Sequence, residues 1–100
     1  MSRDTFVPVA PGWYVSNTGG IVLTGLLAAV TGRRTLRVTF WAGSALHVAE
    51  AVVAYHKAQA AGFTESAPRW ALQTLAVGFP SLLALNAAIE ASTGELGPEV

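Results

Sequence analysis

Three long apolar stretches constrain this 100-residue chain more than any other feature of its sequence. They run from about residues 13 to 30, 36 to 55 and 70 to 89. A helix that crosses a bilayer needs about 20 mostly apolar residues, at about 1.5 Å of rise per residue. The third stretch includes the uncharged run ALQTLAVGFPSLLALNAAI. The sequence therefore predicts an all-α integral membrane protein, a compact bundle of three transmembrane helices.

The low charge content favours this interpretation over a soluble three-helix bundle. Charged residues make up 12% of the chain, against about 25% in soluble domains. Each helix of a soluble bundle carries a polar stripe every three or four residues, and residues 71–89 carry no charge on any face. Six basic and six acidic residues balance, which leaves no basic patch for nucleic acid. We therefore expect the lipid bilayer, and no nucleic acid, around this chain.

The remaining segments are short and suggest a topology. We expect residues 1–12 to form an interfacial or extended segment, residues 13–90 a single transmembrane domain, and residues 91–100 a flexible acidic tail. Arg33, Arg34 and Arg37 lie close together after the first stretch, so the positive-inside rule predicts a cytoplasmic loop there. The N-terminus is then expected outside and the C-terminus in the cytoplasm. Five arginines against one lysine, with abundant Ala, Gly and Val, suggest a high-GC bacterial coding bias. Together with the three apolar stretches, this leads us to expect a multi-pass protein of a bacterial inner membrane.

The second stretch contains ionisable residues, which are rare and costly inside a span. A charged residue at the centre of a span costs about 2.5–3.5 kcal/mol, and the apolar residues of this stretch contribute only about 2–4 kcal/mol together. His47 and Glu50 lie on one helical face and should therefore point at another helix. Counting depth along antiparallel neighbours brings polar residues of the other stretches to the same level. The predicted intramembrane polar cluster or partner interface consists of His47, Glu50, Gln73, Asn17 and Thr18.

Small residues and one proline are predicted to shape the helix contacts. Small residues four positions apart let two helices approach closely in a membrane. Pro80 removes one helical hydrogen bond and frees the carbonyl of Ala76, so a kink is expected there. The predicted packing and kink positions are Gly25, Ala29, Ala45, Ala49, Gly78 and Pro80.

The chemistry of the cluster leaves several roles open. It can be a polar clasp between helices, with Glu50 protonated or paired with His47, or it can meet a buried Arg or Lys of a partner subunit. A proton relay would need further acids. A metal site would need three or four ligands, and this pair supplies two, so we expect no metal and no cofactor. Because no phosphate loop, GxSxG or HExxH motif and no cysteine occurs, we expect no catalytic residues and no enzyme.

Two blocks resemble the most distinctive stretches of a family of small three-span membrane proteins of unknown function, which includes an animal transmembrane branch. The blocks are WAGSALHVAEAVVAYHKA and RWALQTLAVGFPSLLAL. The positions that carry the resemblance are His47, Glu50, Ala51, Tyr55, Trp70, Gln73, Thr74, Gly78 and Ser81. The resemblance implies that His47, Glu50 and Gln73 belong to one site. In size and composition the chain is also similar to LucB-like accessory subunits of the mammalian-cell-entry (Mce) lipid transporter.

This second resemblance implies a partner. The partner would be a larger, permease-like integral membrane protein, and the ATPase would be supplied by other subunits. We therefore expect a non-enzymatic accessory subunit of a multi-subunit inner-membrane complex, an Mce-type ABC importer of lipids or fatty acids. The alternative is a membrane protein that binds a small ligand, a lipid or quinone headgroup, at His47, Glu50 and Gln73.

Overall fold

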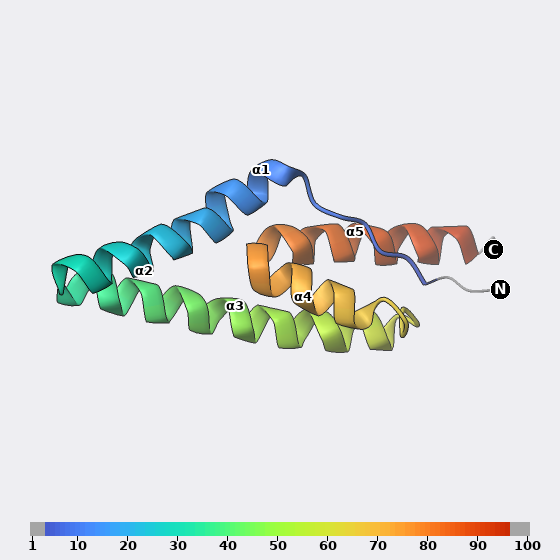
Figure 1. The fold of residues 1–100 in the computed structure, drawn as a ribbon. Helices are drawn as coiled ribbons and strands as arrows, with labels where there is room; N and C mark the ends of the chain where they lie inside the picture. Colours follow the sequence, from blue (N-terminus) through green and yellow to red (C-terminus); the bar gives the residue numbers. More distant parts are fainter. Residues whose placement is uncertain (1–3, 97–100) are drawn as a thin grey trace.

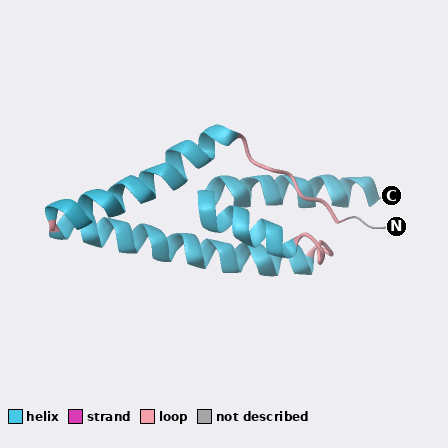
Figure 2. Ribbon diagram, viewed as in Figure 1, coloured by secondary structure: helices cyan, strands magenta, loops and turns pink. Residues whose placement is uncertain are grey.

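The computed structural model of the protein describes residues 4–96, and their regular structure is entirely helical (Figures 1 and 2). An extended segment, residues 4–10, leads into one long helix. This helix consists of α1 (Pro11–Trp13), the π-helical segment η1 (Tyr14–Thr18) and α2 (Gly19–Thr31). The helices α3 (Arg34–Ala60), α4 (Ala67–Val77) and α5 (Phe79–Leu96) follow. The all-α prediction is thus confirmed for the described residues.

A tight turn joins α2 to α3 at one end of the molecule (Figure 1). Gly32 ends α2 in the left-handed conformation, at φ 67°, and its N–H donates to the carbonyl of Ala28. Glycine is favoured at this position of a helix end because it has no Cβ. The Arg37 side chain donates to the carbonyl of Gly32 over 2.7 Å, which fixes the start of α3 against the end of α2.

The third predicted span is wrong as a single transmembrane helix. The chain reverses at Gly78, whose φ of 79° and ψ of −140° few residues other than glycine can adopt. As a result, α4 and α5 form a helical hairpin instead of one rod (Figure 1). The 11 residues of α4 cover about 16 Å, roughly half of a 30 Å hydrocarbon core. Pro80 lies in the first turn of α5, where its missing N–H costs little.

The number of candidate spans is therefore two, not three, among the described residues. The helices Pro11–Thr31 and Arg34–Ala60 are long and apolar enough to cross a membrane, judged by length and composition. Only 6% of the most apolar part of each is buried within the chain, whereas a core helix of a soluble protein is mostly buried. The molecule is also elongated, with extents of 59 × 22 × 20 Å, and not the compact bundle that the sequence suggested.

A small core lies at the end opposite the α2–α3 turn. The fully buried Trp70 of α4 fills its centre, and alanines of α3 let the hairpin approach closely. The buried members of this core come from α3, the following loop and both arms of the hairpin: Ala54, Ala58, Phe63, Ala67, Trp70, Leu85 and Ala88. Because residues 85 and 88 pack with residue 70, this core also requires that α5 folds back along α4.

The hairpin brings the two ends of the described chain together. The extended segment, the loop after α3 and the C-terminal part of α5 lie at one end of the molecule, and the α2–α3 turn lies at the other (Figure 1). The expected placement of the N- and C-termini on opposite sides of a membrane stays a prediction. The region expected to be a flexible tail is helical as far as Leu96, and residues 97–100 lie outside the described residues.

Candidate functional site

The break between α4 and α5 leaves backbone carbonyls without helical partners. The last four carbonyls of a helix have no N–H donor within it. The carbonyl of Thr74 accepts from the N–H of Gly78 over 2.7 Å, but the next three carbonyls find no donor in the α5 backbone, and Pro80 has no N–H to give. In a hydrocarbon environment each unpaired group costs several kcal/mol. The break therefore requires donors from elsewhere.

Three side chains of other helices donate to these three consecutive carbonyls. Asn17 Nδ2 donates to the carbonyl of Val77 over 2.6 Å, and Thr18 Oγ1 donates to that of Ala76 over 2.6 Å. His47 Nδ1 lies 2.8 Å from the carbonyl oxygen of Leu75. The three pairs of side chain and carbonyl are Asn17–Val77, Thr18–Ala76 and His47–Leu75. Asn17, Thr18 and His47 thus each bond a backbone carbonyl of α4 and do not bond one another.

The bond to a carbonyl also fixes the tautomer of the His47 ring. A carbonyl oxygen only accepts hydrogen bonds, so Nδ1 of His47 must carry the proton in its bond to Leu75. In the neutral imidazole, Nε2 is then an acceptor. This second nitrogen lies beside Gly78, because a Cβ built on that glycine would be 2.9 Å from His47 Nε2.

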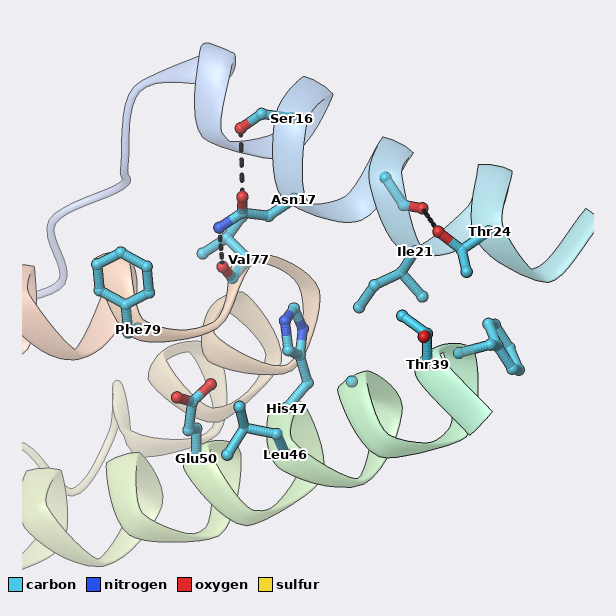
Figure 3. Close-up of a pocket in the computed structure, with 13 residues that line it drawn as sticks. Ser16, Asn17, Ile21, Thr24, Thr39, Leu46, His47, Glu50, Val77 and Phe79 are labelled. Atoms are coloured by element: carbon cyan, nitrogen blue, oxygen red, sulfur yellow. Dashed lines mark hydrogen bonds between the residues drawn. The ribbon is translucent and has the colours of Figure 1, made fainter. Parts of the chain in front are cut away.

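Glu50 approaches the same glycine from the same helix. A Cβ on Gly78 would lie 3.1 Å from Glu50 Oε1, so a side chain here would displace the Glu50 carboxyl group and the His47 ring in addition to the strain of its positive φ. Within residues 4–96, no hydrogen bond or ion pair engages the Glu50 carboxyl group. The side chain is half-buried. Figure 3 shows Glu50 and His47 rising from α3 toward the break.

These side chains border an open groove of about 380 Å³ between the first helix, α3 and the α4–α5 break (Figure 3). One part of its wall is polar and another part is apolar. Its lining contains no Lys or Arg; it consists of Ser16, Asn17, Gly20, Ile21, Thr24, Thr39, Phe40, Gly43, Leu46, His47, Glu50, Val77 and Phe79. Among the residues that the structure describes, no group of three or more His, Cys, Asp or Glu could hold a metal ion.

Gln73 lies away from this groove. Its side chain is buried, at 4% exposure, and it bonds the extended N-terminal segment: Nε2 donates to the carbonyl of Val7 and Oε1 accepts from the N–H of Val9. Nε2 also lies 3.1 Å from Ser81 Oγ of α5. Residue 73 is therefore not in one site with His47 and Glu50, because it lies on the helical face of α4 that the extended segment covers.

Sequence reasoning missed how this segment is attached. The Asp4 carboxylate accepts from the backbone N–H groups of Glu65 and Ser66 at the start of α4. Trp70 Nε1 donates to the carbonyl of Thr5 over 2.8 Å. The pKa of Asp4 lies below its usual range, mainly because Ser66 donates hydrogen bonds to the carboxylate. The N–H of Glu65 and the charge of Arg69 lower this pKa further, and desolvation opposes them. Residues 1–12 show no periodicity that could have signalled these contacts.

The predicted small-residue positions separate into contacting and exposed ones. Gly25 lies against the Phe40 ring, since a Cβ there would be 2.7 Å from Phe40 Cε1. Ala29, Ala45 and Ala49 are exposed, so α2 and α3 approach each other at Gly25 and at the buried Ala28. Of the predicted positions, Gly25 contacts α3 directly, and Ala29 lines a shallow cavity beside it with Phe40 and Trp41 of α3.

The model of one protein family, Transmembrane protein 254, matches residues 3–87. The chain belongs to this family. The match covers the break, the groove and every predicted site residue. No match is found among curated proteins, and none among solved structures.

Membership of the Transmembrane protein 254 family corrects the resemblance drawn from the sequence. The matching family is not one of accessory subunits of the Mce transporter, and no relation to that transporter is found. Together with the two long apolar helices, the family identifies this chain as a membrane protein.

Proposed function

We propose that this Transmembrane protein 254 family member is a non-enzymatic subunit of a larger membrane complex. The observation that carries the proposal is the apolar surface of α2 and of the N-terminal half of α3. Large side chains there are exposed, for example Leu26 at 59% and Trp41 at 67%. The α4–α5 hairpin covers only the other half of α3.

Contact with lipid does not by itself hold α2 and α3 together. Because lipid tails are as apolar as the side chains, helices in a bilayer associate through close packing and polar contacts. The α2–α3 contact at Gly25 and Phe40 is close, but large apolar side chains of both helices, such as Leu26 and Trp41, remain exposed beside it. A larger integral membrane partner would supply the missing packing surface. The polar residues at the break support a non-enzymatic role, since Asn17, Thr18 and His47 are engaged with backbone carbonyls.

The site of action within the cell is part of the same proposal. The composition favours a bacterial inner membrane. Arg33, Arg34 and Arg37 favour a cytoplasmic α2–α3 turn. With the hairpin, both ends of the described chain would then lie outside.

Site-specific photo-crosslinking in native membranes tests the proposal. A photoreactive residue replaces Leu26 on α2, exposed at 59%, or Leu83 on α5, exposed at 60%, which makes the two positions matched in exposure. We expect position 26 to form one discrete adduct with an integral membrane protein, identified by mass spectrometry, and position 83 not to form it. Lipid adducts alone at both positions would refute the subunit proposal.

A second function is favoured by the groove itself. It combines about 380 Å³ of open space with a carboxyl group that has no partner among residues 4–96. Ligand sites are typically concave, mostly apolar and equipped with a few polar groups. We therefore also propose binding of a small amphiphile, with its headgroup at His47 and Glu50. Gln73 takes no part, because it faces the extended segment.

A further inference from the structure

We infer that the groove selects an amphiphile with a primary ammonium headgroup, held by Glu50 and by Nε2 of His47. This inference rests on the second proposed function, amphiphile binding, and names the chemical class of its ligand.

The first step is the hydrogen-bonding character of the groups that face the groove. With a cation bound beside it, Glu50 is a carboxylate and only accepts hydrogen bonds. His47 offers an acceptor at Nε2, because its Nδ1 proton is committed to the carbonyl of Leu75. Both acceptors lie against Gly78, at 2.9 Å and 3.1 Å from the position that a Cβ would take. A primary ammonium carries three donors and no acceptor, so one such group can serve both side chains.

The second step is the charge of the site. The groove lining contains one carboxyl group and no Lys or Arg. In addition, α4 ends at the break, and the C-terminal end of a helix carries a partial negative charge. An anionic headgroup that carries no ammonium, such as a fatty-acid carboxylate, would meet repulsion from Glu50, because the lining holds no Lys or Arg to compensate. A quinone oxygen needs donors, and neither the Glu50 carboxylate nor Nε2 of His47 provides one, so a quinone would bind at lining hydroxyls such as that of Thr39 and not at this pair.

The third step is the space next to the two acceptors. The apolar residues Ile21, Phe40, Leu46 and Phe79 line the same groove. A volume of about 380 Å³ holds a headgroup and a short length of hydrocarbon, and the groove is open, so a longer tail can leave it toward lipid. The site therefore fits an amphiphile better than a free amine.

Photo-labelling with two matched probes tests this inference. The protein is reconstituted in phosphatidylcholine nanodiscs with a diazirine-bearing long-chain primary amine or with the alcohol of the same chain length. Labelled residues are located by mass spectrometry. We expect saturable labelling of groove residues that is about tenfold stronger for the amine than for the alcohol, as for a hydrogen bond to a charged group. Glu50→Gln should remove this preference, and Glu90→Gln, an exposed glutamate of α5 outside the groove, should keep it.

The outcomes separate the two proposals. Equal, saturable labelling of the groove by amine and alcohol would leave amphiphile binding standing and overturn the ammonium selectivity, as would a preference that survives Glu50→Gln. Absence of groove labelling by either probe would overturn both. Competition identifies the source of the headgroup: phosphatidylethanolamine that displaces the amine probe supports a membrane lipid, and displacement by butylamine at similar concentration refutes the need for a tail.

Discussion

The hydroxyl of Thr18 should stabilise the fold more than any other threonine hydroxyl of the first helix. It donates to the carbonyl of Ala76 over 2.6 Å, and Pro80, four residues after Ala76, has no N–H to replace it. Thr18→Val keeps the branched shape and removes the hydroxyl. Hydrogen bonds between helices in membranes contribute about 0.6 kcal/mol on average, and an orphaned buried carbonyl costs about 1–3 kcal/mol. We expect Thr18→Val to lower the free energy of unfolding by about 1–2 kcal/mol.

Thr24→Val is the matched control on the same helix. Thr24 Oγ1 donates to the carbonyl of Gly20 over 2.7 Å, but that carbonyl lies inside α2 and also has a backbone donor. Losing the Thr24 hydroxyl therefore leaves no carbonyl unpaired. We expect a change within about 0.5 kcal/mol.

Equilibrium unfolding in mixed micelles by added SDS measures both variants. Helix content by circular dichroism follows the whole chain. In a background with the exposed Trp13 and Trp41 replaced by phenylalanine, the fluorescence of Trp70, buried in the small core, follows the hairpin. The reasoning would be refuted by equal costs for the two substitutions. It would also fail if Thr18→Val lowered stability without loosening the hairpin, since the bond joins η1 to α4.

Two further predictions concern the ends of α4. Gly78→Ala should prevent the reversal, because φ is positive there and the new Cβ would lie 2.9 Å from His47 Nε2. Gly43→Ala is the control, since its Cβ would have nothing within 4 Å, and it should leave α4 and α5 packed. Disulfide crosslinking between α3 and α5 distinguishes the packed hairpin from the opened one. The lowered pKa of Asp4 means that its contribution to stability is complete above the unfolded-state value and is lost as the pH falls through the lower folded-state value. Trp70 fluorescence should therefore change when the pH falls below the usual carboxyl range. The Asp4→Asn variant, which lacks the carboxylate, should already show this changed fluorescence at neutral pH.

The helical class of the fold could be predicted from the sequence, and the reversal at Gly78 could not. Long uncharged runs such as residues 71–89 predict helices, because a helix satisfies its backbone hydrogen bonds within one segment. Gly78 and Pro80 mark a break, but the same residues are compatible with a kinked span or with a hairpin. The decision between them lies in contacts distant in sequence: Leu85 and Ala88 pack on Trp70 only when α5 returns along α4.

The candidate site was partly accessible to depth counting. Counting residues along the spans places Thr18 and Ala76 at one level, and the structure joins them by a hydrogen bond. Depth cannot tell whether a polar side chain bonds a neighbouring side chain or a freed carbonyl. It also cannot give the face of α4: Gln73 is near the same level as the break, but it faces the extended segment. Trp70 is an aromatic at a helix start, as in an interfacial belt, and it is buried here because Phe6 covers it at 5.0 Å between ring centroids.

The hairpin makes a prediction about topology that a three-span bundle contradicts. His47 lies 13 residues after Arg34, the first residue of α3, so the break is about 20 Å from the α2–α3 turn and within a hydrocarbon core of about 30 Å. Broken backbone at that depth is tolerated where protein groups satisfy it, as the donors of η1 and α3 do here. The arm α5 then leaves the membrane on the side from which α4 entered. The loop after α3 and the end of α5 should share one side, and the α2–α3 turn should lie on the other.

Single-cysteine labelling decides between the two topologies, because the natural chain has no cysteine to remove. The exposed threonines Thr35, Thr64 and Thr93 lie near the α2–α3 turn, in the loop after α3 and late in α5. Each is replaced by cysteine and treated with a membrane-impermeant maleimide in sealed vesicles. We expect positions 64 and 93 to react from the same side and position 35 from the opposite side. If position 93 instead reacted together with position 35, α4 and α5 would form one continuous span, and the carbonyls of residues 75–77 would not need the donors that the fold supplies.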